Sequence, residues 1–230
     1  MDQKKAKDIL DRIVGQVFGF QNPLSLEEAL QKFAFDVKLP QQVFDLNGKP
    51  TWAQSTNPTK FLSFKDALEM PEEHYQRPAR QLSNIEDILG AWAEINEMAT
   101  ERVLESINVA ESDCIYNSED IYRSQTVNRS KNVLFSDTIS DAEFILASQR
   151  SEASTFCIRL EDSAKCSNSF SVQWCNNIVN CLFISDANTL QDCMFTSHMN
   201  NKRFMVANMQ YDEAEYRRLR DIVARWILTG

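Results

Sequence analysis

The pattern of hydrophobic and polar residues is most regular between Asp113 and Asn208, where a small or aliphatic residue recurs at every sixth position. One such column runs from Ile115 to Met205 and contains no charged or aromatic side chain. A second column, offset by three residues, is mostly serine at first and then Leu, Cys, Val and Ile. A fixed period of this kind is typical of a solenoid, in which units stack and share a core.

In every second six-residue unit, a bulky apolar residue comes directly after the residue of the first column. The full repeat therefore has twelve residues. We predict that the bulky residues form a core column of Leu134, Leu146, Ile158, Phe170, Leu182, Met194 and Val206. Periods of six or twelve fit 3.6 residues per turn poorly, and Ser, Asn, Cys, Ile and Val are weak helix formers. The sequence therefore predicts a parallel β-solenoid over residues 113–208, drawn as a flattened coil with two corners. Twelve and twenty-four residues per coil, and either handedness, remain open.

All glycines and prolines lie outside the repeat, so other residues must turn the chain there. Asparagine tolerates left-handed backbone, and stacked amides can form ladders. We therefore predict a corner ladder of Asn128, Asn176, Asn188 and Asn200. The alternative is that these are solvated loop asparagines without a ladder.

The N-terminal part, residues 1–34, predicts amphipathic helices. Its apolar stripe includes Ile9, Ile13, Val17 and Phe18, and Ser25 with Glu28 forms a capping box for a second helix. Residues 35–82 are rich in proline and predict an extended arm with one hairpin, because Asn47-Gly48 is a hairpin turn signal. We predict that the stripe, together with Phe44 and Trp52 of the arm, makes assembly contacts.

Residues 83–112 predict an acidic helix, capped by Ser83 or Asn84. Its apolar stripe is expected to run from Ile88 through Trp92 to Val103. Glu94, Glu97, Glu101 and Glu105 would form the other face, either as a solvated surface or as a docking face for a basic partner.

Residues 209–230 predict a helix that begins with a second capping box, Asp212 and Glu215, and caps the last rung of the solenoid. The predicted fold class is therefore mixed α and β: a solenoid with N-terminal helices and arm and a C-terminal capping helix.

The formal charge of -9 disfavours binding to a nucleic acid backbone. The charged start of the chain has no signal-peptide pattern and no run predicts a membrane span, so we expect synthesis in the cytoplasm, with or without later incorporation into a particle.

No catalytic, cofactor-binding or metal-binding residues are predicted. The chain has two histidines, no C-x-x-C pair and no glycine-rich nucleotide loop. Its cysteines fall mainly on the small-residue columns and are interpreted as core residues with free thiols. Acidic residues such as Asp186 and Asp192 leave open a carbohydrate-active or glycan-binding solenoid face.

The run from Asn201 to Tyr211, followed by Glu215-Tyr216, resembles the closing segment of an uncharacterised family of Cys/Asn/Ser-rich repeat proteins from candidate-phylum bacteria and phages. The resemblance covers the C-terminal half and implies a solenoid closed by a helix, without an activity. Members often bear a CaiB/BaiF label, which implies a CoA-transferase that no residue here supports. Together these features predict a non-enzymatic assembly protein that associates with itself or with a shell or capsid protein, as in a phage virion, and that has no small-molecule substrate.

Overall fold

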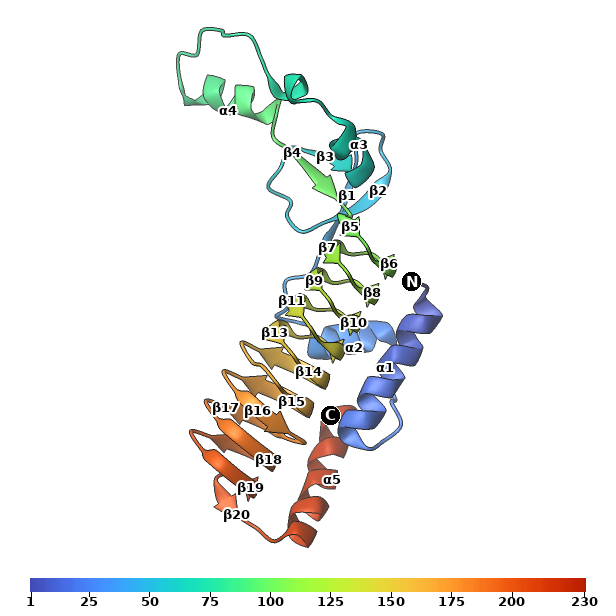
Figure 1. The fold of residues 1–230 in the computed structure, drawn as a ribbon, viewed down its shortest axis with the longest axis vertical. Helices are drawn as coiled ribbons and strands as arrows, with labels where there is room; N and C mark the ends of the chain where they lie inside the picture. The colour runs from blue at the N-terminus through green and yellow to red at the C-terminus, as the bar shows by residue number, and fades with distance from the viewer.

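A computed structural model describes residues 1–230 and shows a long body with a smaller head at one end (Figure 1). We define the head as residues 41–100 and the body as the rest of the chain. The body is a parallel β-solenoid of about nine turns. Three helices pack along one of its faces: α1 (Gln3–Phe18), α2 (Leu26–Phe33) and α5 (Glu213–Thr229).

Successive coils of the solenoid pair in parallel with a register of twelve residues, as in Ile115 with Val127 and Val133 with Ile145. Twelve residues per coil is therefore correct, and twenty-four is excluded. The solenoid begins at Val103, ten residues earlier than predicted. Its parallel strands are β5 (Val103–Leu104), β6 (Ile107–Ala110), β7 (Asp113–Tyr116), β8 (Glu119–Tyr122), β9 (Gln125–Asn128), β10 (Lys131–Leu134), β11 (Asp137–Ser140), β12 (Glu143–Leu146), β13 (Gln149–Glu152), β14 (Thr155–Glu161), β15 (Ser167–Gln173), β16 (Asn176–Val179), β17 (Leu182–Ser185), β18 (Asn188–Ser197) and β19 (Asn200–Val206).

The coil turns at every third residue, because each third residue from Glu105 to Ala207 has a left-handed backbone with φ between 45° and 60°. Twelve residues divided by three gives four such residues per coil, so the flattened two-corner shape predicted above is wrong. None of them is glycine. Each left-handed residue carries a steric cost of about 1–2 kcal/mol, which the hydrogen bonds and packing between coils must offset.

The predicted asparagine column does not turn the chain. Left-handed backbone falls one residue later, for example at Arg129 and Asn177. Asn176, Asn188 and Asn200 do pair in register on successive coils, whereas Asn128 is separated from them by Ser140, Glu152 and Ala164. The Asn188 amide oxygen accepts a hydrogen bond from the neighbouring Thr189 hydroxyl instead of from a stacked amide. The corner assignment is therefore wrong by one residue.

The lumen of the solenoid is a narrow core of aliphatic side chains bridged by serines. Ser124, Ser136 and Ser148 are fully buried and stack on successive coils. The Ser136 hydroxyl donates to the Leu134 carbonyl at 2.8 Å and accepts from the Ser148 backbone N–H at 3.1 Å. Each serine thereby satisfies polar backbone groups that water cannot reach. The recurring small residues are thus hydrogen-bonding bridges as well as packing units.

A second core lies outside the coil, between one solenoid face and the helices. The column of bulky residues from Leu134 to Met194 belongs to it, with each exposed by 5% or less, and partly buried Val206 packs at its edge. The prediction that these residues are buried is correct, but they point away from the lumen. The α1 stripe covers them, as in the contact of Phe18 with Phe170 at 5.4 Å between ring centroids.

The helix α5 lies along this same face, in line with α1, and does not cover the end of the solenoid (Figure 1). Its Tyr216 packs on Phe204, and Arg220 donates to the Val17 carbonyl at the end of α1. The short strand β20 (Met209–Gln210) instead pairs antiparallel with β19 at the last coil. The prediction of a helix that caps the last rung is therefore wrong in its placement.

The head consists of two small sheets and short helices. Its elements are β1 (Gln41–Phe44), β2 (Pro50–Ala53), β3 (Lys60–Ser63), α3 (Phe64–Glu69), η1 (Glu72–Tyr75), α4 (Ile85–Ala93) and β4 (Glu97–Thr100). The hairpin turn at Asn47-Gly48 is confirmed, since β1 and β2 pair antiparallel around it and Gly48 has φ of 74°.

The predicted acidic helix over residues 83–112 is much shorter in the structure. It ends at Ala93, and residues 97–100 form β4, which pairs in parallel with β3. Glu97 becomes a buried partner of Lys60 and His74, while Glu101 and Glu105 adopt left-handed backbone. No continuous acidic helix face exists, so docking of a basic partner on such a face is excluded.

Candidate functional site

The most distinctive surface of the molecule is the apolar stripe of α4, which nothing in the chain covers. Ile85, Ile88, Leu89 and Trp92 follow one another at helical spacing. Their exposed fractions lie between 49% and 58%. This helix has no buried residue and lies at the far tip of the head (Figure 1).

Polar contacts hold α4 at both ends. The Asn84 side chain accepts from the Asp87 N–H at 2.8 Å, and the Asp87 carboxylate accepts from the Ser83 N–H. At the other end, the Thr59 hydroxyl and the Lys60 ammonium donate to the Ala93 and Glu94 carbonyls at 2.7 Å. Caps define where a helix starts and stops, but packing of an apolar face supplies most helical stability. The stripe of α4 therefore has the apolar composition of a helix face that packs against a partner, but no partner covers it in this chain.

The charges on α4 are divided between its ends. Glu86 and Asp87 lie in its first turn. Near its last turn, Arg80 contacts Glu94 at 2.7 Å and Arg77 contacts it at 3.9 Å. The hydrogen bond from Arg80 lowers the pKa of the Glu94 carboxyl below its usual value. The helix is thus acidic at its start and carries more cations than carboxylates around its end.

The open N-terminal end of the solenoid also exposes apolar side chains. Strand β6 pairs only with β8, and Ile107 and Leu104 are 60% and 52% exposed. The neighbouring strand β5 pairs only with β7, and Glu101, between the head and β5, donates its N–H to the Trp52 carbonyl of the head. Both strands of the first coil therefore have one unpaired edge.

Asp113 fastens the head to the body. Its carboxylate is fully buried and accepts from the Arg102 guanidinium at 2.6 and 3.0 Å and from the Gln54 N–H at 2.9 Å. The hydrogen bond to Asp113 raises the pKa of the Arg102 guanidinium above its ordinary value. This role of Asp113 was not predicted from the sequence, although an acidic residue stands at the start of a repeat unit.

Among the predicted assembly contacts, the structure separates the helix from the arm. Ile9, Ile13, Val17 and Phe18 are exposed by 6% or less and pack inside the body, so they are not free for contacts between molecules. That part of the assignment is wrong. In the arm, Phe44 is 65% exposed, whereas Trp52 is partly covered and lies 5.7 Å from the Arg123 guanidinium.

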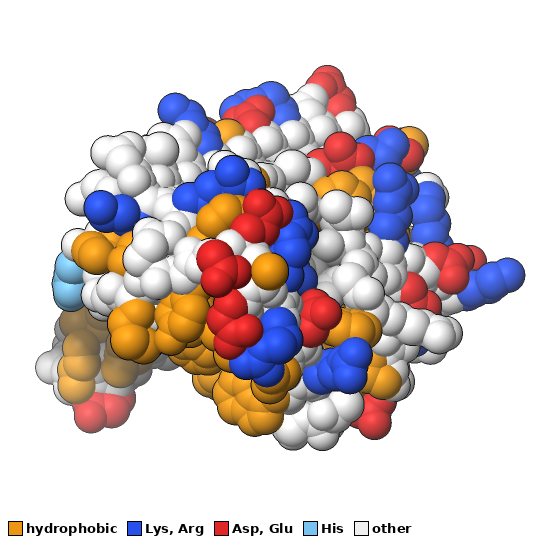
Figure 2. All heavy atoms as spheres, turned by 90° about the horizontal axis from the view of Figure 1, so that it is seen from below, with side chains coloured by type: hydrophobic (Ala, Val, Ile, Leu, Met, Phe, Trp, Pro, Cys, Tyr) orange, Lys and Arg blue, Asp and Glu red, His pale blue; other side chains and the backbone are white.

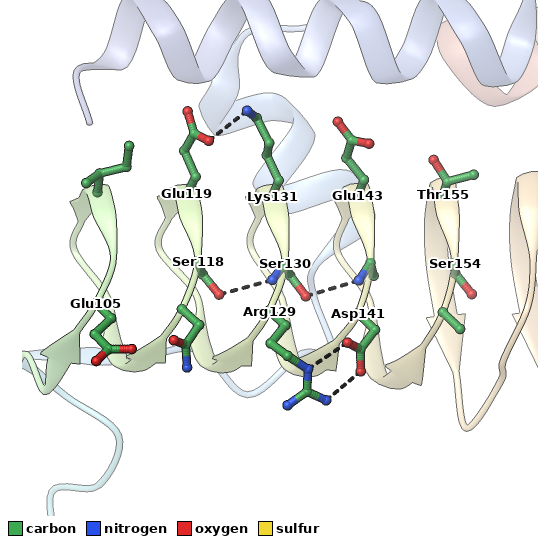
Figure 3. A pocket seen from close by; sticks show the side chains of 14 residues that line it. Glu105, Ser118, Glu119, Arg129, Ser130, Lys131, Asp141, Glu143, Ser154 and Thr155 are labelled. Atoms are coloured by element: carbon green, nitrogen blue, oxygen red, sulfur yellow. Dashed lines mark hydrogen bonds and ion pairs between the residues drawn. The ribbon is translucent and has the colours of Figure 1, made fainter.

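A shallow polar groove of about 1080 Å³ runs across five coils of the solenoid. Figure 3 shows Ser118, Ser130 and Ser154 along its floor between two rows of charged side chains. Two of its carboxylates are already paired: Arg129 binds Asp141 through two hydrogen bonds of 2.7 Å, and Lys131 contacts Glu119 at 2.7 Å. The pKa of Asp141 is lowered by its hydrogen bond from Arg129, which is opposite to what a general acid requires.

The acidic residues that left a glycan site open do not converge. Asp186 lies 3.8 Å from His198, whereas Asp192 lies on a different side of the coil and contacts Arg203 at 3.2 Å. These are pairs between neighbouring coils that fit a solvated surface. No group of His, Cys, Asp and Glu residues is arranged to hold a metal ion.

All six cysteines are buried free thiols. Five of them lie in the lumen, and Cys114 instead contacts Gln54 of the head. Cys181 takes the place of a bridging serine, because its sulfur donates to the Val179 carbonyl and accepts from the Cys193 N–H. Burial raises the pKa of Cys114 to about 11 and that of Cys166 to about 12. Their protonated state and lack of access suit packing better than catalysis.

An apolar pocket of about 320 Å³ opens between α2 and α5, where Phe33, Phe35, Phe183 and Trp226 line it. Seen from the C-terminal end, the surface has a hydrophobic patch at one edge beside interspersed acidic and basic side chains (Figure 2). Phe170 and Phe33 of the pocket belong to the second core. This pocket is therefore a partly open seam of the body, unlike the stripe of α4.

Comparison with protein-family models, curated proteins and solved structures finds no match to this chain. The resemblance noted for the C-terminal half stays a prediction. Among the helices, none combines the length and the apolar composition needed to span a bilayer.

Proposed function

We propose that this chain is a non-enzymatic assembly protein, in which the solenoid body serves as a rigid spacer and the head carries the contact surface. The observation that carries this proposal is the contrast in coverage. Every bulky residue of the body column is packed under a helix, whereas the stripe of α4 is half exposed at the tip of the head. Exposed contiguous apolar surface of this kind marks interaction sites.

The architecture supports a spacer role. Each coil is tied to the next by backbone pairing, serine bridges and ion pairs such as Arg150 with Asp162 at 2.7 Å. Solenoids of stacked repeats are extended and contact mainly their neighbours, so they hold their two ends at a fixed separation. A subunit of a larger particle, such as a virion, is one setting in which this arrangement would be used.

Truncation is a poor test, because removing residues 1–80 would also remove α1 and expose the second core. The better test keeps the full chain and changes Ile88→Asp together with Trp92→Asp. The tagged chain is cross-linked in its native cells, and its complexes are separated by size. We expect the wild type in complexes much heavier than the 26.5 kDa chain and the variant as the free chain.

Two results would contradict the assembly role. One is a wild-type chain that occurs only at 26.5 kDa in its native cells. The other is a variant that remains in the same heavy complexes as the wild type. Ile222→Asp with Trp226→Asp on α5 is the matched control, because these residues are 54% and 59% exposed outside the head. The control is expected to keep the complexes.

Glycan binding is the second candidate, and the polar groove favours it over a catalytic site. Glu105 and Glu143 line the groove without an ion pair, beside the exposed side chains of Asn117 and Thr155, which could bind sugar hydroxyls. A glycan array with the wild type and with Glu143→Gln tests this candidate. Binding that the substitution removes would support it, and an array without binding would exclude it.

A further inference from the structure

The uncovered α4 stripe has features that select one partner. It is nine residues long and bounded by caps, and its four apolar residues fall at positions that place them on one side of the helix. Helices with such a stripe pack against another apolar helix or groove. The charges at the two ends of the stripe indicate which partner surface covers it.

The two ends of α4 carry opposite net charge. Glu86 and Asp87 at the start sum to -2, since neither is in an ion pair. Around the end, Lys60, Arg77 and Arg80 face the carboxylates of Glu94 and Glu97, and three cations minus two carboxylates give +1. His74 also contacts Glu97 and adds positive charge when protonated.

A helix with one acidic and one basic end complements itself when it is turned around. In an antiparallel pair related by a two-fold axis, the acidic start of each helix meets the basic end of the other. Ile85 then lies opposite Trp92, and Ile88 opposite Leu89, so both stripes are covered at once. A parallel pair would instead bring two acidic ends together. Two-fold interfaces that use the same patch twice are the commonest way in which identical chains associate.

We propose that α4 is a homodimerisation helix, and that a second copy of this chain covers its stripe by antiparallel α4–α4 packing. This inference rests on the proposed assembly role and names the partner. The interface is small, because nine residues per chain provide it, and the nearby Leu82, 45% exposed, can extend it. Small interfaces of this kind give reversible association. The dimer is therefore expected to form with increasing concentration and to bring two solenoids together through their heads.

Charge reversal at one end at a time tests the orientation. The first variant carries Glu86→Lys and Asp87→Lys, and the second carries Arg77→Glu and Arg80→Glu. In a dimer of either variant alone, the facing ends have charges of the same sign. The first variant has +2 at the start of α4 and +1 at its end, and the second has -2 at the start and -3 at the end. In an equimolar mixture, both junctions of a mixed dimer have opposite signs.

Sedimentation velocity from low to high micromolar concentration provides the readout. We expect a wild-type dimer, a dissociation constant raised by about tenfold or more in each variant, and recovery of the dimer in the mixture, reduced by salt. Asp66→Lys with Glu69→Lys on α3 is the control for a charge change in the head outside α4, and it should leave the dimer intact. Thermal melting checks that all variants are folded.

Cysteine pairing gives a second readout that does not depend on charge. Ile85 and Trp92 are seven residues apart, or about 10 Å along the helix. A mixture of Ile85→Cys and Trp92→Cys chains should form a mixed disulfide on oxidation, and either variant alone should form little. Disulfides within each single variant would instead indicate a parallel pair and overturn the proposal.

Three further results would overturn the inference: a purified wild type that stays monomeric at high concentration, a dimer that persists with Ile88→Asp, or folded charge variants that do not associate when mixed. These outcomes are separable from the assembly role. A monomeric purified chain that still enters heavy complexes in its native cells refutes the homodimer alone. A dimer in solution with only dimer-sized species in those cells supports the homodimer and refutes incorporation into a larger particle.

Discussion

The helices α1 and α4 are both amphipathic, but the apolar stripe is buried in α1 and exposed in α4. In α1, seven residues of the apolar stripe are buried against the solenoid face and α2. In α4, the stripe is capped at both ends and has no buried residue. An apolar stripe in a sequence therefore shows that a helix needs a partner, but it does not show whether the partner is in the same chain. The body supplies its own partner and the head does not.

The largest expected difference comes from placing a charge in each stripe. Ile13→Asp buries a charge without a partner in the body, and it should cost about 3–5 kcal/mol of unfolding free energy. Ile88→Asp in α4 meets solvent, so its effect on the isolated monomer should stay within about 0.5 kcal/mol. Denaturant unfolding at low concentration measures both. Equal losses would mean that the head stripe is packed in the monomer.

The joint between the regions is the next target. Asp113→Ala removes the acceptor for Arg102 and Gln54. The loss should be roughly 2–3 kcal/mol, less than for a fully buried pair because the Arg102 side chain is 25% exposed. Limited proteolysis should then cleave the head while the body stays intact. Uniform resistance across the chain would argue against Asp113 as the fastening point.

Within the body, the serine bridges can be tested singly. Ser136→Ala leaves the buried Ser148 N–H without its acceptor and should cost about 1–3 kcal/mol. Ser136→Cys should cost less, since Cys181 already bridges two coils in the same way. The control, Ser55→Ala in the head, has no bridge between coils to remove. A fully neutral Ser136→Ala would contradict the bridging role.

The smallest effects concern the buried thiols. Burial holds the pKa of Cys114 at about 11 and that of Cys166 at about 12, above the ordinary 9.0. The folded chain thus keeps protons that unfolded thiols lose, so stability should fall as pH rises from about 9 to about 12. At neutral pH, alkylation should be slow until the chain unfolds. Rapid labelling of the five lumen cysteines in the native protein would contradict a closed lumen.

The period of twelve predicted the architecture because, in a parallel solenoid, equivalent residues of successive coils are separated by a constant number of residues. The sequence could not distinguish residues of the lumen from residues of the face covered by helices, because both kinds are apolar and buried. Ile115 belongs to the lumen and Leu146 to the second core, and both are fully buried. The sequence also predicted one acidic helix over residues 83–112, because apolar spacing continues past Ala93 to Val103. Pairing of β4 with β3 overrides that local pattern. The uncovered stripe of α4 was visible as a pattern, but its lack of a partner depends on tertiary contacts.

Amide hydrogen exchange, measured by mass spectrometry at low and at high protein concentration, tests the contrast between α1 and α4 most directly. The account predicts that α1 exchanges as slowly as the solenoid strands at both concentrations, because its partner is in the same chain. It predicts that α4 exchanges rapidly at low concentration and becomes protected at high concentration. Fast exchange of α1, or protection of α4 that does not depend on concentration, would contradict it.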